Sequence, residues 1–193
     1  MSTTAWNKDD VLARVKDGGS LIGEDLSGID LSGERLSGVD FSRAVLNDAC
    51  LKGANLTEAK LHQTKLQKAD LSGAVLRRAY LVAADLLGAV LDGAVLEEAF
   101  LSGAILGGAS FKGAVLKRAR LGVVQIAFPN PSGRATSLRD ADLEGAVVNA
   151  TDFTGVDLRG ANLKQAYLYE AKLRGAIVDK AQFKDAITRA ESF

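Results

Sequence analysis

The sequence has few of the residues on which catalysis, metal binding and disulfide bonding depend. Its 193 residues include one histidine, one cysteine and one tryptophan. Neither His62 nor Cys50 has a catalytic partner in the sequence pattern, and a metal site needs several such ligands in a cluster. A single cysteine excludes an internal disulfide framework. We therefore expect no catalytic residues, no metal, no cofactor and no enzymatic activity.

The sequence also lacks an excess charge and a long apolar run. Lysine and arginine together number 24, as do aspartate and glutamate, so the formal net charge is zero. Direct nucleic-acid binding is not expected, because phosphate contacts need a basic excess. No apolar run reaches the length of about 18 residues that suggests a membrane span, and the first residues lack the apolar segment of a signal peptide. We expect a cytoplasmic protein without membrane contact.

The most regular feature is a repeat of five residues, seen best between Ala69 and Val123. A large apolar residue returns at every fifth position, with alanine two residues before it. In a helix, five residues would rotate the side chain by about 140°, and in a flat strand an odd spacing reverses the face. A short extended piece followed by a corner keeps both residues inside. The apolar positions are Leu71, Leu76, Leu81, Leu86, Leu91, Leu96, Leu101, Leu106, Phe111, Leu116 and Leu121.

The repeat resembles that of the pentapeptide-repeat family. It reads ADLSG at Ala69, ANLTE at Ala54 and ANLKQ at Ala161, and the resemblance covers residues 24–193. It implies a right-handed β-helix of square cross-section with four pentapeptides per coil. The predicted fold is therefore an all-β solenoid, a right-handed quadrilateral β-helix with a short N-terminal capping α-helix. About eight coils at roughly 4.8 Å each would form a rod about 40 Å long.

We divide the chain into a capping helix and two repeat sections separated by a loop. Asn7 is the expected N-cap of a helix that ends near Asp17, and Val11, Leu12 and Val15 form its apolar stripe. The helix is expected to cover the first coil, because an open end of a repeat array exposes its core. A partner-binding helix is the alternative. The segments are 1–20 (capping helix), 21–127 (first section), 128–136 (loop) and 137–193 (second section).

The loop is expected where the repeat loses its phase. Both prolines, Pro129 and Pro131, lie there, and Ile126 and Leu138 are twelve residues apart instead of ten. The array therefore slips by two residues, and the register of the second section relative to the first stays open. Loops that project from a repeat scaffold often bind partners, but a tolerated insertion is an equal alternative. The candidate interaction residues of the loop are Phe128, Asn130 and Arg134.

The outward residues suggest two kinds of surface. With four repeats per coil, residues twenty apart are vertical neighbours, so Glu58, Arg78, Glu98 and Arg118 alternate in sign and favour a solvated salt-bridge ladder. Tyr80 and Phe100 are also vertical neighbours. Exposed apolar patches often mark interfaces, although cover by the loop or plain β-propensity would also explain them. A second column holds Val147, Tyr167 and Ile187; the candidate interaction residues outside the loop are Tyr80, Phe100, Tyr167 and Tyr169.

We therefore expect a non-enzymatic scaffold that binds a protein partner through its surface or its loop. The C-terminal coil has no obvious cap, and an uncovered apolar edge favours end-to-end pairing of two copies. The candidate residues of this homodimer end are Phe183, Ile187 and Phe193.

The family resemblance also implies an alternative function. Some pentapeptide-repeat proteins resemble a DNA rod in size and charge, bind DNA gyrase and protect it from toxins or quinolones. The neutral charge argues against this function here, because mimicry of phosphates needs a negative surface. A continuous acidic stripe would favour gyrase, whereas mixed charge beside an aromatic patch would favour a protein scaffold.

Overall fold

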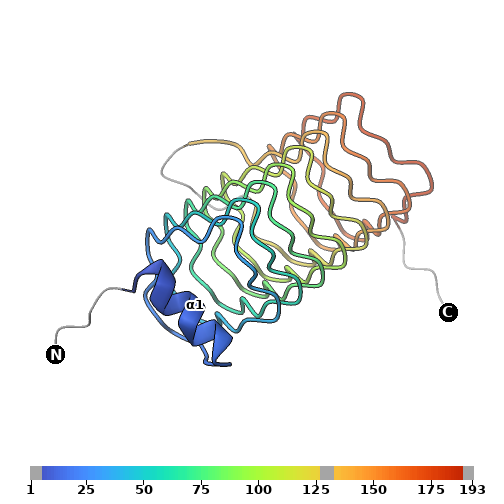
Figure 1. Ribbon diagram of the computed structural model, residues 1–193. Helices are drawn as coiled ribbons and strands as arrows, with labels where there is room; N and C mark the ends of the chain where they lie inside the picture. The colour runs from blue at the N-terminus through green and yellow to red at the C-terminus, as the bar shows by residue number, and fades with distance from the viewer. Residues whose placement is uncertain (1–5, 127–132, 189–193) are drawn as a thin grey trace.

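The computed structural model describes residues 6–126 and 133–188, and they form a stack of four-sided coils. Figure 1 shows the stack as a straight rod, with the helix α1 (Lys8–Lys16) across its N-terminal end. Each side contributes one bridged residue per coil, paired in parallel with the residue twenty positions later, as in Asp25 with Val45. The strand segments are no longer than these single bridges. The predicted right-handed quadrilateral β-helix is confirmed.

The core consists of the leucine positions and the alanines two residues before them. Leu71 and Leu91 are fully buried, as are the alanines two residues before the leucines in the middle coils. A fully buried leucine stabilises the fold by roughly 1.5–3 kcal/mol, and alanine leaves room for the next leucine. The backbone of each coil bonds to the next, as where the Leu71 amide donates to the Val90 carbonyl at 2.7 Å. No described side chain has a buried polar atom without a partner.

The corners explain why the repeat prefers aspartate or asparagine just before the leucine. The Asp30 carboxylate accepts a hydrogen bond from the Ser32 amide at 2.9 Å, and the Asn55 side chain accepts one from the Thr57 amide at 3.1 Å. Such side chains stabilise a turn by satisfying its first free N–H group. The corner residue two positions after the leucine has a positive φ. At Gly103 this φ is 72°, a value that glycine adopts without strain.

The N-terminal helix forms where the sequence predicts it. Asn7 caps α1: its side chain accepts from the Asp10 amide at 2.9 Å, and the Asp10 carboxylate accepts from the Asn7 amide. This reciprocal pair is a capping box. Val11 is fully buried against the first coil, so α1 covers the apolar end of the rod. Within the described ranges, no helix has the length and apolar character that a membrane crossing requires.

Two glutamates of the first coils hold this cap in place. Glu24 and Glu34 occupy positions where the repeat has alanine. The Trp6 indole donates to the Glu24 carboxylate at 3.0 Å, and the Lys8 ammonium forms an ion pair with Glu34. The two glutamates that replace the repeat alanine therefore bind the N-terminal segment that covers the first coil.

The register across the predicted loop is set by the bridges on both sides of it. Ser110 pairs with Ser137 and Arg120 with Val147, twenty-seven positions later instead of twenty. Seven residues are thus inserted, and the three sides that are bridged across the insertion continue in line. Thr136, which we had assigned to the loop, is buried in the array, and its hydroxyl donates to the Leu106 carbonyl at 2.9 Å. Residues 127–132, with Phe128 and Asn130, lie outside the described residues.

The last described coil is less enclosed than the others. Its inward residues Leu173 and Phe183 are half-buried, and Val178 is 41% exposed, whereas the leucines of the middle coils are fully buried. No described residue stacks on this coil. The predicted end residue Phe193 lies outside the described residues.

The corner hydrogen bonds predict how stability depends on pH. Hydrogen bonds from the hydroxyl and amide groups of Ser27 and Ser32 lower the pKa of Asp25 and Asp30 below the ordinary value of 3.8. Their stabilising effect is complete above that pH and is lost as the pH falls through the lowered values. Replacing both aspartates by asparagine, as at Asn55, should leave the neutral melting temperature nearly unchanged and reduce its fall between pH 4 and pH 2. Melting curves at each pH measure this, and an unchanged fall would contradict it.

The cap predicts a strong effect of charge at its buried face. Val11→Asp would bury a carboxylate against the first coil and should lower the free energy of unfolding by roughly 3 kcal/mol. Ala13→Asp is the matched control, because Ala13 is exposed on the same helix. Urea unfolding and proteolysis within α1 measure the two variants. Equal stability of both would show that α1 does not cover the core in solution.

Candidate protein-interaction surface

One side of the rod gathers most of the exposed apolar side chains. We call it the aromatic side. Its bridged residues run along the rod in the order Asp40, Lys60, Tyr80, Phe100, Arg120, Val147, Tyr167 and Ile187, and the corner that follows them belongs to it. Seven large apolar residues of the described chain are exposed; two of them, Ile177 and Val178, lie in the last coil. The other five lie on the aromatic side or its corner: Ile22, Tyr80, Val123, Tyr167 and Tyr169.

The middle of the aromatic side is a row of four planar groups, of which the two central rings are stacked. The rings of Tyr80 and Phe100 are 5.0 Å apart and almost parallel, at 3°. His62 lies at one end, 5.6 Å from the ring of Tyr80, and the guanidinium of Arg120 lies at the other, 5.3 Å from the ring of Phe100. The rings stack because their backbones are bridged, and bridged strands lie about 4.8 Å apart.

The two apolar columns of the sequence form one continuous column. Arg120 is bridged to Val147, Val147 to Tyr167, and Tyr167 to Ile187. The sequence left this alignment open, because it depends on how many corners the insertion uses. Ile187, proposed from the sequence for the dimer end, thus continues the aromatic side.

Arg120 is the one cation of this column without an ion pair to a described residue. Lys60 lies 3.7 Å from the Asp40 carboxylate. Arg120 is exposed, and its guanidinium lies over the Phe100 ring instead of beside an acid of the described chain. Sequence reasoning did not single out Arg120. The signal that could have found it is its position twenty residues after Phe100.

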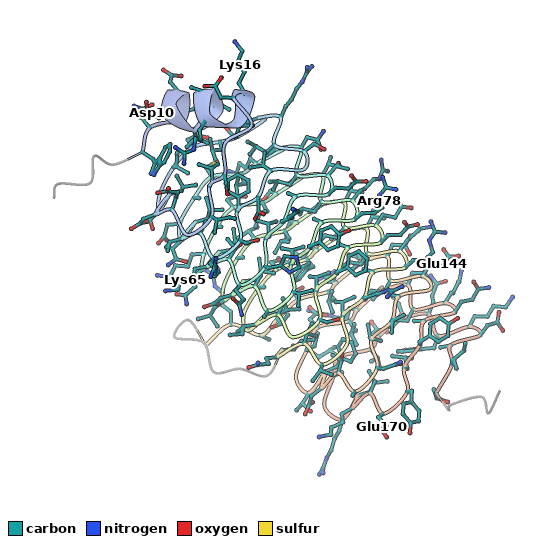
Figure 2. The ribbon with its side chains drawn as sticks, turned by 90° about the horizontal axis from the view of Figure 1, so that it is seen from below. Asp10, Lys16, Lys65, Arg78, Glu144 and Glu170 are labelled. Atoms are coloured by element: carbon teal, nitrogen blue, oxygen red, sulfur yellow. The ribbon has the colours of Figure 1, made fainter. Side chains whose placement is uncertain are left out.

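A salt-bridge ladder runs along the corner that precedes the aromatic side, as the sequence predicts. Arg77 pairs with Glu97 at 3.1 Å, and Arg118 pairs with Glu98 at 3.1 Å. Further along, Glu144 and Asp142 each pair with a lysine, Lys117. Figure 2 shows Arg78 and Glu144 on the same edge of the rod and Lys65 on the other edge. Each exposed pair stabilises the fold by about 0–1 kcal/mol, so the ladder leaves this corner electrically balanced.

A shallow hollow lies between the ladder and the aromatic side. Its volume is about 320 Å³, and its lining residues are Lys117, Arg118, Glu144, Gly145, Gln165 and Tyr167. Gly145 keeps it open, since a side chain there would begin 3.4 Å from the Arg118 side chain. Hydrogen bonds to Glu144 and Asp142 raise the pKa of Lys117 and hold its charged end in the ladder. The hollow therefore offers one aromatic wall and no unpaired acid.

The remaining candidates lie elsewhere. Arg134 is exposed. The insertion follows the side of Gln125 in the chain, which is one side beyond the aromatic side. Tyr169 lies at the corner of the aromatic side, and Phe183 lies at the inside of the last coil. Among the described residues, no group of three histidine, cysteine or acidic side chains is arranged to hold a metal ion.

Comparison with solved structures gives similar repeat proteins. HetL, a pentapeptide-repeat protein involved in heterocyst differentiation regulation in Nostoc sp. strain PCC 7120, is 29% identical, with a TM-score of 0.48 over 95% of this chain and 97% of that one. A trypsin-treated form of QnrB1, a plasmid-mediated fluoroquinolone resistance protein, is 18% identical, with a TM-score of 0.52 over 86% of each chain. The second likeness shows the fold alone.

A sequence comparison gives the family. No curated protein sequence matches the chain significantly. The profile of pentapeptide repeats matches in eight copies, which cover residues 25–93, 96–122 and 136–187. These ranges span most of the chain and end on both sides of the insertion. The chain therefore belongs to the pentapeptide-repeat family.

Proposed function

We propose that this protein is a non-enzymatic repeat scaffold that binds a protein partner through the aromatic side. The observation that carries the proposal is the concentration of exposed apolar residues on one side of a four-sided rod. An exposed aromatic patch of this kind is typical of interaction surfaces. Stability does not require it, because the core of every middle coil is already complete without these outward residues.

The composition of the aromatic side supports protein binding in particular. Tyrosine and arginine are enriched among the residues that dominate binding energy at protein interfaces. Here Tyr80, Arg120 and Tyr167 belong to one column of a rigid scaffold. A surface fixed by backbone bridges loses little conformational entropy when a partner binds, which favours affinity.

The gyrase alternative has less support. The likeness to QnrB1 shows the fold alone. The charged corner of the rod alternates in sign, as in the pairs of Arg77 with Glu97 and Arg118 with Glu98, so it does not form an acidic stripe. A mixed-charge surface beside an aromatic patch favours a protein scaffold over mimicry of DNA.

Site-specific photo-crosslinking would test the proposed surface. A photoreactive phenylalanine analogue at Tyr80 or Tyr167 should cross-link a protein partner in a lysate of the source organism, and the same analogue at Val90, on the opposite side, should not. A variant with Tyr80→Ser and Phe100→Ser should lose at least tenfold in capture at Tyr167, because interface aromatics of this kind contribute about 1–3 kcal/mol.

Other outcomes would relocate the function. Cross-links at Val90 alone would contradict the aromatic side. Loss of capture on deletion of residues 128–134 would move the site to the loop and its candidates Phe128, Asn130 and Arg134. Gyrase in the cross-linked band would make the alternative function the leading one.

The exposed end of the rod supports a second proposal, self-association of two copies through the C-terminal coil. The apolar inward residues Leu173, Val178 and Phe183 are only partly covered there. We expect a dimer in sedimentation equilibrium at micromolar concentration and a monomer for Val178→Asp. Ile177→Asp is the control, because Ile177 points outward in the same coil. A monomeric wild-type protein would contradict this proposal.

A further inference from the structure

We infer that the aromatic side docks an acidic, apolar segment of its protein partner, with a carboxylate of that segment on Arg120 and an apolar side chain in the hollow beside Tyr167. This inference rests on the proposed function and specifies the chemistry of the partner. The carrying observations are a cation within the apolar column that no described acid pairs with, a strained apolar corner next to it, and the hollow.

The stack holds the Arg120 guanidinium ready for a planar anion. The group lies over the Phe100 ring at 5.3 Å, and Phe100 stacks on Tyr80. A guanidinium stacked on a ring still has N–H groups at its edge, and these match the two oxygens of a carboxylate. The contact with the Phe100 ring restricts the Arg120 side chain, so less rotamer entropy is lost when a carboxylate binds than for a free arginine.

The charges around Arg120 select an acid over a base. On the same coil, Lys117 pairs with Asp142 and Glu144, and Arg118 pairs with Glu98. No described acid pairs with Arg120. A neutral segment would therefore remove water from the Arg120 guanidinium without supplying an anion in its place, and a basic segment would be repelled by the guanidinium. A segment with its own carboxylate supplies the counter-charge that no described residue gives Arg120.

Val123 marks the corner next to Arg120 as more than a turn. It has a φ of +57° and is 65% exposed. A positive φ is strained for a β-branched residue, and the equivalent residues of the neighbouring coils are Gly103 and Ala150. The fold would be more stable with glycine there. An exposed valine held at this strain is what an apolar contact with a partner would require.

The hollow provides the site for the apolar side chain. Tyr167, 45% exposed, forms one wall, and Lys117 and Arg118 direct their charged ends to the ladder acids. The hollow exists because Gly145 has no side chain. Gly145 has a φ of +65°, and Gln165 occupies the same corner of the next coil with a φ of +56°. An unbranched side chain therefore adopts this conformation in the rod at a modest cost, unlike the β-branched Val123.

The test uses the full-length protein and a phage-displayed library of random linear peptides. Selected peptides should be enriched in aspartate or glutamate next to leucine or phenylalanine. Their affinity, measured by fluorescence anisotropy, should fall about tenfold in Arg120→Gln, as expected for the loss of a charge-assisted hydrogen bond. Changing the peptide acid to its amide should cause a similar loss, and combining both changes should add little. Arg35→Gln is the control, because Arg35 is exposed at the same repeat position of another side.

Two further variants separate binding from stability. Val123→Gly should raise the melting temperature and weaken the peptide. Gly145→Gln should fill the hollow and weaken the peptide severalfold, while the melting temperature stays within a few degrees of the wild type. A purely structural role would not raise stability while weakening binding in Val123→Gly, nor weaken binding at nearly constant stability in Gly145→Gln.

Several results would overturn the inference. Peptides without an acid preference, displaced by Tyr80→Ser with Phe100→Ser but insensitive to Arg120→Gln, would overturn it and leave the aromatic side as the binding surface. Competition by a single-stranded oligonucleotide in place of a peptide would also overturn it. Enrichment of no peptide, together with no cross-link at Tyr80 or Tyr167, would overturn both this inference and the proposed function.

Discussion

The structure depends on hydrogen bonds that join each coil to the next at a fixed vertical spacing. The Leu71 amide donates to Val90 in the following coil, and the Val90 amide donates back to Ala69. Within each repeat section, a residue therefore lies above the residue twenty positions earlier, and the same type of contact is repeated along the rod. Inward, this repetition demands leucine and alanine. Outward, it converts sequence differences into columns, because a side chain always meets the same position of the neighbouring coil.

The columns allow two different solutions on adjacent surfaces. At the ladder corner, residues alternate in sign, so that the cations of the middle coils contact an acid of a neighbouring coil, as Arg118 contacts Glu98. On the aromatic side, the neighbours are rings, and a cation lies over the last ring, as Arg120 does over Phe100. In the middle coils the charges of the ladder are paired with one another. The aromatic column leaves ring edges, a charge and a hollow toward solvent, and this difference between two neighbouring surfaces distinguishes a supporting surface from an interaction surface.

Much of the fold could be predicted from the sequence because it follows from one period. The five-residue spacing gives the four-sided coil, the N-cap at Asn7 gives α1, and the twenty-residue spacing gives the ladder. The register across the insertion could not be predicted. Leu138 follows Ile126 by twelve positions, and this spacing fits one repeat plus seven inserted residues as well as two repeats plus two extra residues. Pairing of Ser110 with Ser137 decides between them. The contacts of Glu24 and Glu34 with the cap also escape a one-dimensional pattern, since their partners precede the repeat.

The candidate site was predictable only where its residues repeat. Tyr80 and Phe100 share a spacing, whereas Arg120 breaks the apolar column, Val123 differs from its neighbours by its backbone angle, and the hollow comes from the missing side chain of Gly145. These are departures from the repeat. In a fold whose core is satisfied by a uniform pattern, outward positions can vary at little cost to stability, so a costly departure needs another cause. Val123 is such a departure: glycine occupies many equivalent corners, and the strain of valine has no compensating contact within the buried core. The repeat thus serves as a reference: residues that depart from it, and that the coil does not need for stability, are the candidates for contact with a partner.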